Sequence, residues 1–221
     1  FYMENRTPIT KEQCSQYVLW ATVDTEDERF YEHNGVDIKG ILRAVVAQLS
    51  GGSEGASTIT QQLVRNTVLS DEQFEQTLSR KVREAYIATQ LEQMYSKDDI
   101  LMMYLNSIYY GAGCYGIEAA AQTYFGKPCS QLTIAEAATL AGLPQSPSYY
   151  NPLANPESAI ERRNVVLAHL LDKGHITQQE YDDAVASDLV LNYTPPEKSG
   201  AYAYPYFVDY VKSTLSTQFS T

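Results

Sequence analysis

The sequence is poor in cysteine, histidine and tryptophan, with three, three and one of these among its 221 residues. The cysteines, Cys14, Cys114 and Cys129, are odd in number and lack metal-ligand spacing, so the sequence indicates neither a disulfide framework nor a zinc site. We interpret them as small buried residues. The histidines have no spacing typical of a metal triad, and no Ser or Cys stands in a recognisable nucleophile motif, so hydrolase triads have no support.

Basic residues are also scarce, because 16 Lys and Arg stand against 27 Asp and Glu and give a net charge of −11. A general nucleic-acid-binding protein needs a basic surface to displace counterions from phosphates, so we expect no nucleic-acid partner. Four basic residues nevertheless fall close together, at Arg65, Arg80, Lys81 and Arg83. They indicate either a local anion site or a solvated helix face.

Long apolar runs are absent: none reaches the roughly 18 residues that cross a bilayer, and the first residues lack the pattern of a signal peptide. Apolar residues make up 44% of the chain and charged residues 19%, as in folded globular proteins. The length suits one domain with a short tail. The 18 tyrosines suit either core packing or a surface at a membrane interface.

Helical patterns dominate from residue 36 onward and predict a mainly α fold. Four helix starts carry capping signals, at Ser96 with Asp99, Thr133 with Glu136, Thr177 with Glu180, and Asn155 before Pro156. The first of these starts is followed by apolar residues at three- and four-residue steps, namely Ile100, Leu101, Tyr104, Leu105 and Ile108. From residue 193 the composition changes to Pro, Gly and Tyr, which is typical of a linker.

Two carboxylates are candidate catalytic groups. Glu26 begins the string EDERFYEHNG, and Glu84 ends the string RKVRE. Glu84 shares a helical stripe with Ala88 and Leu91, which predicts a semi-buried position that a structural ion pair explains equally well. The segment between them, GASTITQQLVRN at residues 55–66, fits either a polar ligand site or the polar face of an amphipathic helix. His33, in the first string, fits a structural histidine in a turn.

Taken together, these strings form five ordered motifs: EDERFYEHNG, GASTITQQLVRN, RKVRE, KDDILMMYLNSIYYGAGCYGIEAAAQTYFGK from Lys97, and RRNVVL from Arg162. In them the chain resembles the peptidoglycan glycosyltransferases, which occur as the N-terminal domain of bifunctional class A penicillin-binding proteins and as monofunctional enzymes. The resemblance covers about residues 15 to 190. Arg65 stands where the family more often has Lys.

The resemblance implies a mainly α fold, a lysozyme-like helical lobe with a smaller membrane-associated jaw lobe at residues 36–55. It implies a glycosyltransferase domain at residues 1–192, followed at 193–221 by a linker or the start of a transpeptidase domain. Penicillin binding is not expected of the segment itself, because it lacks a Ser-x-x-Lys nucleophile. In the jaw lobe, the residues expected to touch lipid, although they suit a protein core equally well, are Ile38, Ile41, Leu42, Val45, Val46 and Leu49.

The implied reaction polymerises lipid II into β-1,4-linked glycan strands, with inversion and release of undecaprenyl pyrophosphate. Glu26 matches the family's catalytic base. Glu84 matches its second essential acid, which either orients the neighbouring cations or holds a divalent ion, Mg²⁺ or Mn²⁺; no organic cofactor is expected. By resemblance, the substrate-binding residues are Asp27, His33, Ser57, Thr58, Gln61, Gln62, Arg65, Asn66, Arg80, Lys81 and Asn106.

The resemblance also places the domain on the extracytoplasmic face of the bacterial cell membrane, with an N-terminal anchor expected to lie outside this chain. Its expected partners are lipid II, the lipid-linked glycan chain, the membrane surface and other proteins of cell-wall synthesis, with moenomycin as an inhibitor. Two alternatives stay open. One is a glycan hydrolase with the same fold, and the other is a non-catalytic module that binds lipid II.

Overall fold

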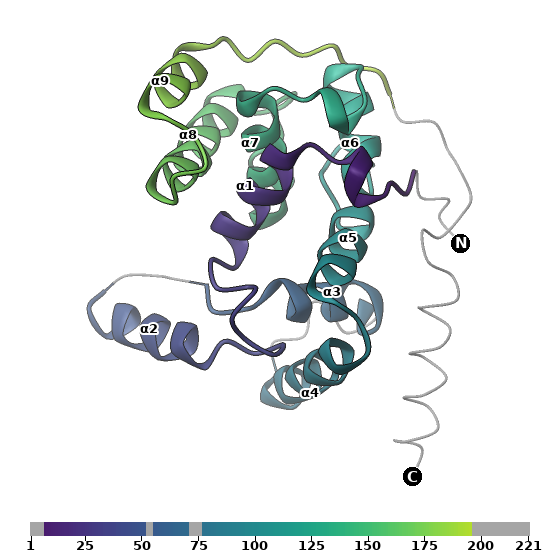
Figure 1. Ribbon diagram of the computed structural model, residues 1–221, viewed down its shortest axis with the longest axis vertical. Helices are drawn as coiled ribbons and strands as arrows, with labels where there is room; N and C mark the ends of the chain where they lie inside the picture. The colour runs from purple at the N-terminus through teal and green to yellow at the C-terminus, as the bar shows by residue number, and fades with distance from the viewer. Residues whose placement is uncertain (1–6, 52–54, 71–76, 196–221) are drawn as a thin grey trace. The chain divides into compact units, whose positions relative to one another are not determined.

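The computed structural model describes residues 7–51, 55–70 and 77–195, which are mainly helical, as the sequence predicts (Figure 1). Within these ranges the only β pairing is an isolated bridge between Tyr109 and Tyr115. No helix in the described ranges has the length and apolar content to cross a membrane. The helices are α1 (Gln16–Glu26), α2 (Ile38–Leu49), α3 (Ile59–Thr67), α4 (Leu78–Met94), α5 (Lys97–Ser107), α6 (Ile117–Phe125), α7 (Ile134–Gly142), α8 (Pro156–Asp172) and α9 (Gln178–Ala186), with 3-10 helices η1 (Lys11–Gln13), η3 (Cys129–Gln131) and η4 (Leu143–Gln145).

The predicted capping signals begin helices α5, α7, α8 and α9. At α7 and α9 the Thr hydroxyl accepts from the N–H of the Glu three residues on, and that Glu side chain accepts from the Thr N–H. At α5 the hydroxyl of Ser96 and the carboxylate of Asp99 exchange the same bonds. Asn155 does lie at the N-cap of α8, but its side chain makes no capping bond. It donates instead to the carbonyls of Ser148 and Tyr149 in the preceding loop.

The chain forms two compact units, one of which is interrupted in sequence by the other. Of the described residues, the discontinuous unit comprises 7–25 and 105–195, and the inserted unit comprises 26–51, 55–70 and 77–104. The boundaries fall at Glu26, the last residue of α1, and after Tyr104 within α5.

The core of the discontinuous unit joins α1 to the three C-terminal helices. Small side chains on α7, such as Ala138 and Ala141, meet the larger Val166, Leu167 and Leu170 of α8, which lies beside α7 (Figure 1). Small residues on one helix allow its partner to approach closely, and the interlocked apolar atoms are removed from water. This packing is the structural reason for the alanine-rich sequence of α7.

Arg163, in the fifth motif, has a structural role in the same unit. Its side chain is 2% exposed, and its guanidinium donates to the backbone oxygens of Val185 and Ser187 at the end of α9. The last carbonyls of a helix have no partner within the helix, so a buried cation that binds them stabilises that end.

In the inserted unit, α3 packs on α4, and a turn of the first motif approaches α4 closely. Gly35 has φ +86°, and a Cβ atom built there would lie 2.7 Å from the backbone oxygen of Ala88. Any side chain would therefore clash with the helix and strain the turn. Glycine at the end of EDERFYEHNG brings the first motif against the helix that carries the third.

Candidate active site

Glu26, the predicted base, is the last residue of α1 and is half-buried. Its carboxylate oxygen Oε2 accepts a hydrogen bond of 2.8 Å from Nε2 of Gln62 on α3. The amide oxygen of Gln62 accepts from the buried hydroxyl of Tyr104 at 3.2 Å. Because Gln62 is bonded at both ends, it holds the Glu26 carboxylate in one position.

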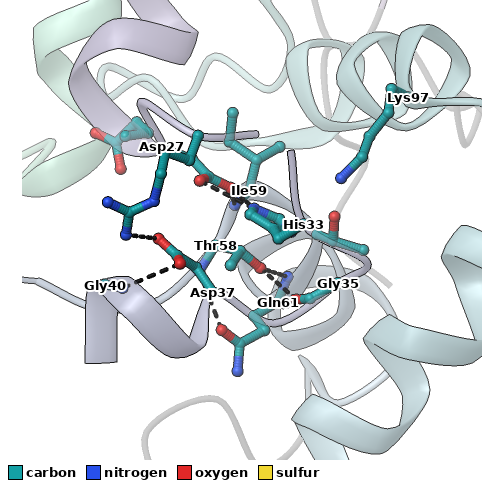
Figure 2. Close-up of polar contacts among 12 residues, drawn as sticks. Asp27, His33, Gly35, Asp37, Gly40, Thr58, Ile59, Gln61 and Lys97 are labelled. Atoms are coloured by element: carbon teal, nitrogen blue, oxygen red, sulfur yellow. Dashed lines mark hydrogen bonds and ion pairs between the residues drawn. The ribbon is translucent and has the colours of Figure 1, made fainter. Parts of the chain in front are cut away.

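Asp27 and His33 form a second set of contacts in the first motif (Figure 2). Nε2 of His33 lies 2.9 Å from Oδ2 of Asp27, and the same oxygen accepts from the backbone N–H of Ile59 at 3.0 Å. Both side chains are almost fully buried. A buried carboxylate at the N-terminus of α3 also meets the positive end of the helix dipole, so this contact joins the first motif to the second.

This network extends to residues that the sequence analysis did not single out. The buried carboxylate of Glu92 accepts from Thr60 at 2.5 Å, pairs with Lys97 at 2.7 Å, and lies 3.9 Å from Nδ1 of His33. Glu92 continues the stripe of Glu84 and Ala88 at four-residue steps on α4. This four-residue spacing is the sequence signal that could have identified Glu92. It indicates a site residue only once the stripe is known to be buried.

Glu84, the second predicted acid, is completely buried on α4. Its Oε2 accepts from the Arg80 guanidinium at 2.5 Å, and its Oε1 accepts from Nζ of Lys81 at 2.7 Å. Lys81 Nζ also donates to the hydroxyl of Ser57 at 2.8 Å. The carboxylate therefore fixes two cations, one buried and one partly exposed, at the N-terminal end of α4.

Both oxygens of Glu84 bind cations in the structure, and the divalent ion that the resemblance implies stays a prediction. The described residues also contain no group of three or more His, Cys, Asp and Glu that could hold one. Of the two roles that the resemblance implied for Glu84, the geometry supports the orientation of Arg80 and Lys81.

Some residues of the second motif cap α3, and others lie on one face of that helix. Thr58 and Gln61 form a capping box: the hydroxyl of Thr58 accepts from the N–H of Gln61, whose side chain accepts from the N–H of Thr58. The sequence analysis overlooked this box, although its Thr-x-x-Gln spacing is visible there. Arg65 and Asn66 follow Gln62 at three- and four-residue steps, so they share its face of α3.

Asn106 belongs to the chain's other unit. Its amide donates to the backbone oxygen of Ile9 at 2.9 Å and accepts from the N–H of Ile9 at 3.0 Å. The side chain is 1% exposed. The other predicted site residues, from Glu26 to Glu84, all belong to the inserted unit. The substrate-binding role of Asn106 stays a prediction.

A comparison with protein families identifies the class of protein. The family model described as Transglycosylase matches residues 1–171. The chain therefore belongs to the transglycosylase family, and the assignment drawn from the five motifs is confirmed.

Individual relatives are penicillin-binding proteins. Penicillin-binding protein 1A of Escherichia coli (strain K12) is 47% identical over 218 residues, which are 98% of this chain and 25% of the relative. Penicillin-binding protein 1A of Aquifex aeolicus (strain VF5) is 41% identical over 220 residues, 98% of this chain and 29% of the relative. The crystal structure of penicillin-binding protein 1A from Haemophilus influenzae matches with a TM-score of 0.54 and 26% identity, over 100% of this chain and 22% of that one.

The chain spans about a quarter of the length of these relatives. The findings confirm the mainly helical fold and the assignment to the peptidoglycan glycosyltransferases. The jaw lobe, the domain boundary after residue 192 and the roles of individual site residues stay predictions. Residues 196–221, in the predicted linker or transpeptidase start, lie outside the described residues.

Proposed function

We propose that this chain polymerises lipid II into β-1,4-linked glycan strands and releases undecaprenyl pyrophosphate. The observation that carries the proposal is the composition of the inserted unit. It holds a positioned carboxylate, Glu26, and a separate cation cluster, Arg80 and Lys81 on Glu84. Glycosyl transfer to a hydroxyl from a pyrophosphate needs both a base and a partner for the leaving anion.

In the proposed reaction, the 4-hydroxyl of the acceptor sugar attacks C1 of the donor sugar. Glu26 takes the hydroxyl proton as the new C–O bond forms, because an alcohol is a weak nucleophile while it keeps its proton. The bond from C1 to the pyrophosphate breaks on the opposite face, so the anomeric centre inverts. The pyrophosphate leaves with the bonding electrons, and Arg80 and Lys81 bind its added charge.

Arg65 is the third proposed contact for the pyrophosphate. It lies in the last turn of α3 and makes no hydrogen bond or ion pair with any residue in the described ranges. Its guanidinium presents two parallel donors, which suits two oxygens of one phosphate. We propose that a divalent ion, if the reaction uses one, arrives bound to the pyrophosphate, since the described residues offer it no ligand cluster.

We further propose that the domain works on the extracytoplasmic surface of the cell membrane, with α2 against the lipid. The apolar side chains of α2 point out of the inserted unit, with exposed fractions from 39% at Ile41 to 84% at Leu49. At the start of the helix, Asp37 accepts from the N–H of Gly40 and from Arg29 (Figure 2). Burial raises the pKa of Asp37, but these two bonds outweigh it, so this pKa lies below its ordinary value and the cap stays charged.

The test is polymerisation of lipid II by the variant Glu26→Gln. We expect a loss of at least about a hundredfold, because general base catalysis contributes that much or more. Glu32→Gln is the matched control, since Glu32 is an exposed acid in the same motif whose side chain makes no hydrogen bond or ion pair with the described residues. Near-normal polymerisation by Glu26→Gln would refute the assignment of the base.

Two other results would refute the proposed activity itself. Release of soluble fragments from finished peptidoglycan, without polymerisation, would show a hydrolase. Binding of lipid II without turnover would show a non-catalytic module. Inhibition of polymerisation by moenomycin is the further result that we expect of a glycosyltransferase of this kind.

A further inference from the structure

Two cysteines that lie 115 positions apart in the sequence meet inside the discontinuous unit. The Sγ atoms of Cys14 and Cys129 are 3.5 Å apart, and both residues are buried. The third cysteine, Cys114, is also buried, but its Sγ is directed to the backbone oxygen of Ala112 at 3.9 Å. The three cysteines therefore divide into one contacting pair and one separate thiol.

Short local structures hold the two cysteines of the pair. Cys14 is the C-cap of η1, and its N–H donates to the oxygen of Lys11 at 3.1 Å. Cys129 is the first residue of η3, and its N–H donates to the carboxylate of Glu118 at 2.8 Å. Because both backbones are fixed, the sulfurs face each other in the folded chain.

We propose that Cys14 and Cys129 are a disulfide site, oxidised to a disulfide bond in the folded protein when a disulfide donor is present. A disulfide bond has its sulfurs about 2.05 Å apart, so the pair must close by roughly 1.5 Å, a distance that small changes of side-chain torsion cover. Cys114 stays a free thiol because its sulfur does not contact either partner.

The donor is a disulfide compound, either a small disulfide such as oxidised glutathione or a disulfide-bonded oxidoreductase. The thiolate of one cysteine attacks a donor sulfur, which forms a mixed disulfide and releases the first donor thiolate. The thiolate of the other cysteine then attacks the sulfur of the first and releases the second donor thiolate. The two cysteine protons pass to the two released thiolates, and the donor is reduced by the two electrons that the cysteines lose.

The hydrogen bond between the two sulfurs favours the first of these steps, with Cys129 as the attacking thiolate. The Cys14 hydrogen bond lowers the pKa of Cys129, because a neighbouring thiol stabilises the thiolate by donating to it. The same bond, with burial, raises the pKa of Cys14. Since both sulfurs are buried, we expect the donor to reach them when the segments around η1 and η3 open locally.

The proposed disulfide bond would join the two sequence segments that form the discontinuous unit. Cys14 belongs to the first segment of the discontinuous unit and Cys129 to the second, so the covalent loop between them contains the whole described part of the inserted unit. A cross-link across such a long loop removes many conformations from the unfolded chain. It also joins the segment that leads into α1, whose last residue is Glu26, directly to η3.

The experiment refolds the reduced chain in a buffer of reduced and oxidised glutathione, alkylates free thiols in denaturant, and maps the peptides after chymotrypsin digestion. Chymotrypsin cuts after aromatic residues and so separates Cys114 from Cys129, for example at Tyr115 and Tyr124. We expect a linked peptide of Cys14 and Cys129, with Cys114 alkylated. Alkylation of all three cysteines, or any link through Cys114, would overturn the proposal.

Variants and thermal unfolding complete the test. Cys114→Ser is the matched control and should keep the linked peptide, whereas Cys14→Ser and Cys129→Ser should each lose it. The oxidised parent chain should unfold on the order of 10 °C above its reduced form, and the unfolding of Cys14→Ser should not depend on reductant. Equal melting temperatures of the oxidised and reduced parent chain would refute the stabilising role.

Discussion

Glu84 accepts hydrogen bonds from two cations while it has no contact with solvent. Removal of one partner from a buried ion pair leaves the other charge without compensation, and this is more harmful than the pair is beneficial. At this residue, stability and the proposed binding of pyrophosphate therefore depend on the same bonds.

We predict that Glu84→Ala lowers the free energy of unfolding by about 3 kcal/mol, because Arg80 stays buried without its carboxylate. For a chain of this size that is a fall in melting temperature of on the order of 10 °C. Glu28→Ala removes a more exposed acid that pairs with Arg43, and it should change the stability by less than about 1 kcal/mol. Thermal unfolding followed by circular dichroism measures both. Equal, small changes in the two variants would contradict the role given to Glu84.

At the residue scale, the sequence left the ion-pair partners of Glu84 open, and the structure identifies them. The stripe of Glu84 with Ala88 and Leu91 predicted burial, and all three residues are buried. The sequence analysis named no particular cation as the partner of Glu84. Helical spacing favours Arg80 and Lys81, four and three residues before Glu84, and both pair with it.

Helix α2 is unusual for a helix of a folded domain because its apolar side chains are exposed. A helix of a globular protein buries one apolar face, but on α2 only Gly40 is buried. The pattern of residues 38–49 is that of a packed helix, and the sequence allowed either core or lipid contact. The exposed side chains favour the second interpretation, on which the proposed membrane location depends.

We predict that Leu42→Glu weakens binding to phosphatidylcholine vesicles roughly tenfold or more, because a buried Leu contributes about 2 kcal/mol of transfer free energy and a charge opposes insertion. Gln48→Glu on the same helix adds the same charge at a polar, exposed position and should bind nearly as the parent chain does. Co-sedimentation with the vesicles measures the bound fraction. Unchanged binding of Leu42→Glu would rule out α2 as the contact.

At the scale of the whole molecule, the acidic charge produces no cluster of metal-ligand side chains in the part of the chain that the structure describes. The net charge is −11, but the described acids do not gather into a group that could hold a metal ion. The fold is stabilised by apolar burial and by ion pairs such as Glu92 with Lys97.

We therefore predict that EDTA leaves the melting temperature unchanged within about 1 °C, since a bound ion stabilises a fold only where the folded chain offers it ligands. Calorimetric scans with EDTA and with added Mg²⁺ provide the comparison. A fall of several degrees in EDTA would reveal a protein-bound ion. Loss of polymerisation alone, at an unchanged melting temperature, is the result expected if the ion binds with the pyrophosphate.

The sequence by itself determined the helical character from residue 36 onward, the caps of α5, α7 and α9, and the family. Caps such as Thr133 with Glu136 involve residues three positions apart, and the five motifs are contiguous strings. Both can therefore be identified from the sequence alone. The tertiary structure alone decided which distant residues meet: Gln62 with Glu26, Glu92 with His33, and Cys14 with Cys129. These contacts depend on how helices pack and on one unit's insertion into another, and no local spacing encodes either.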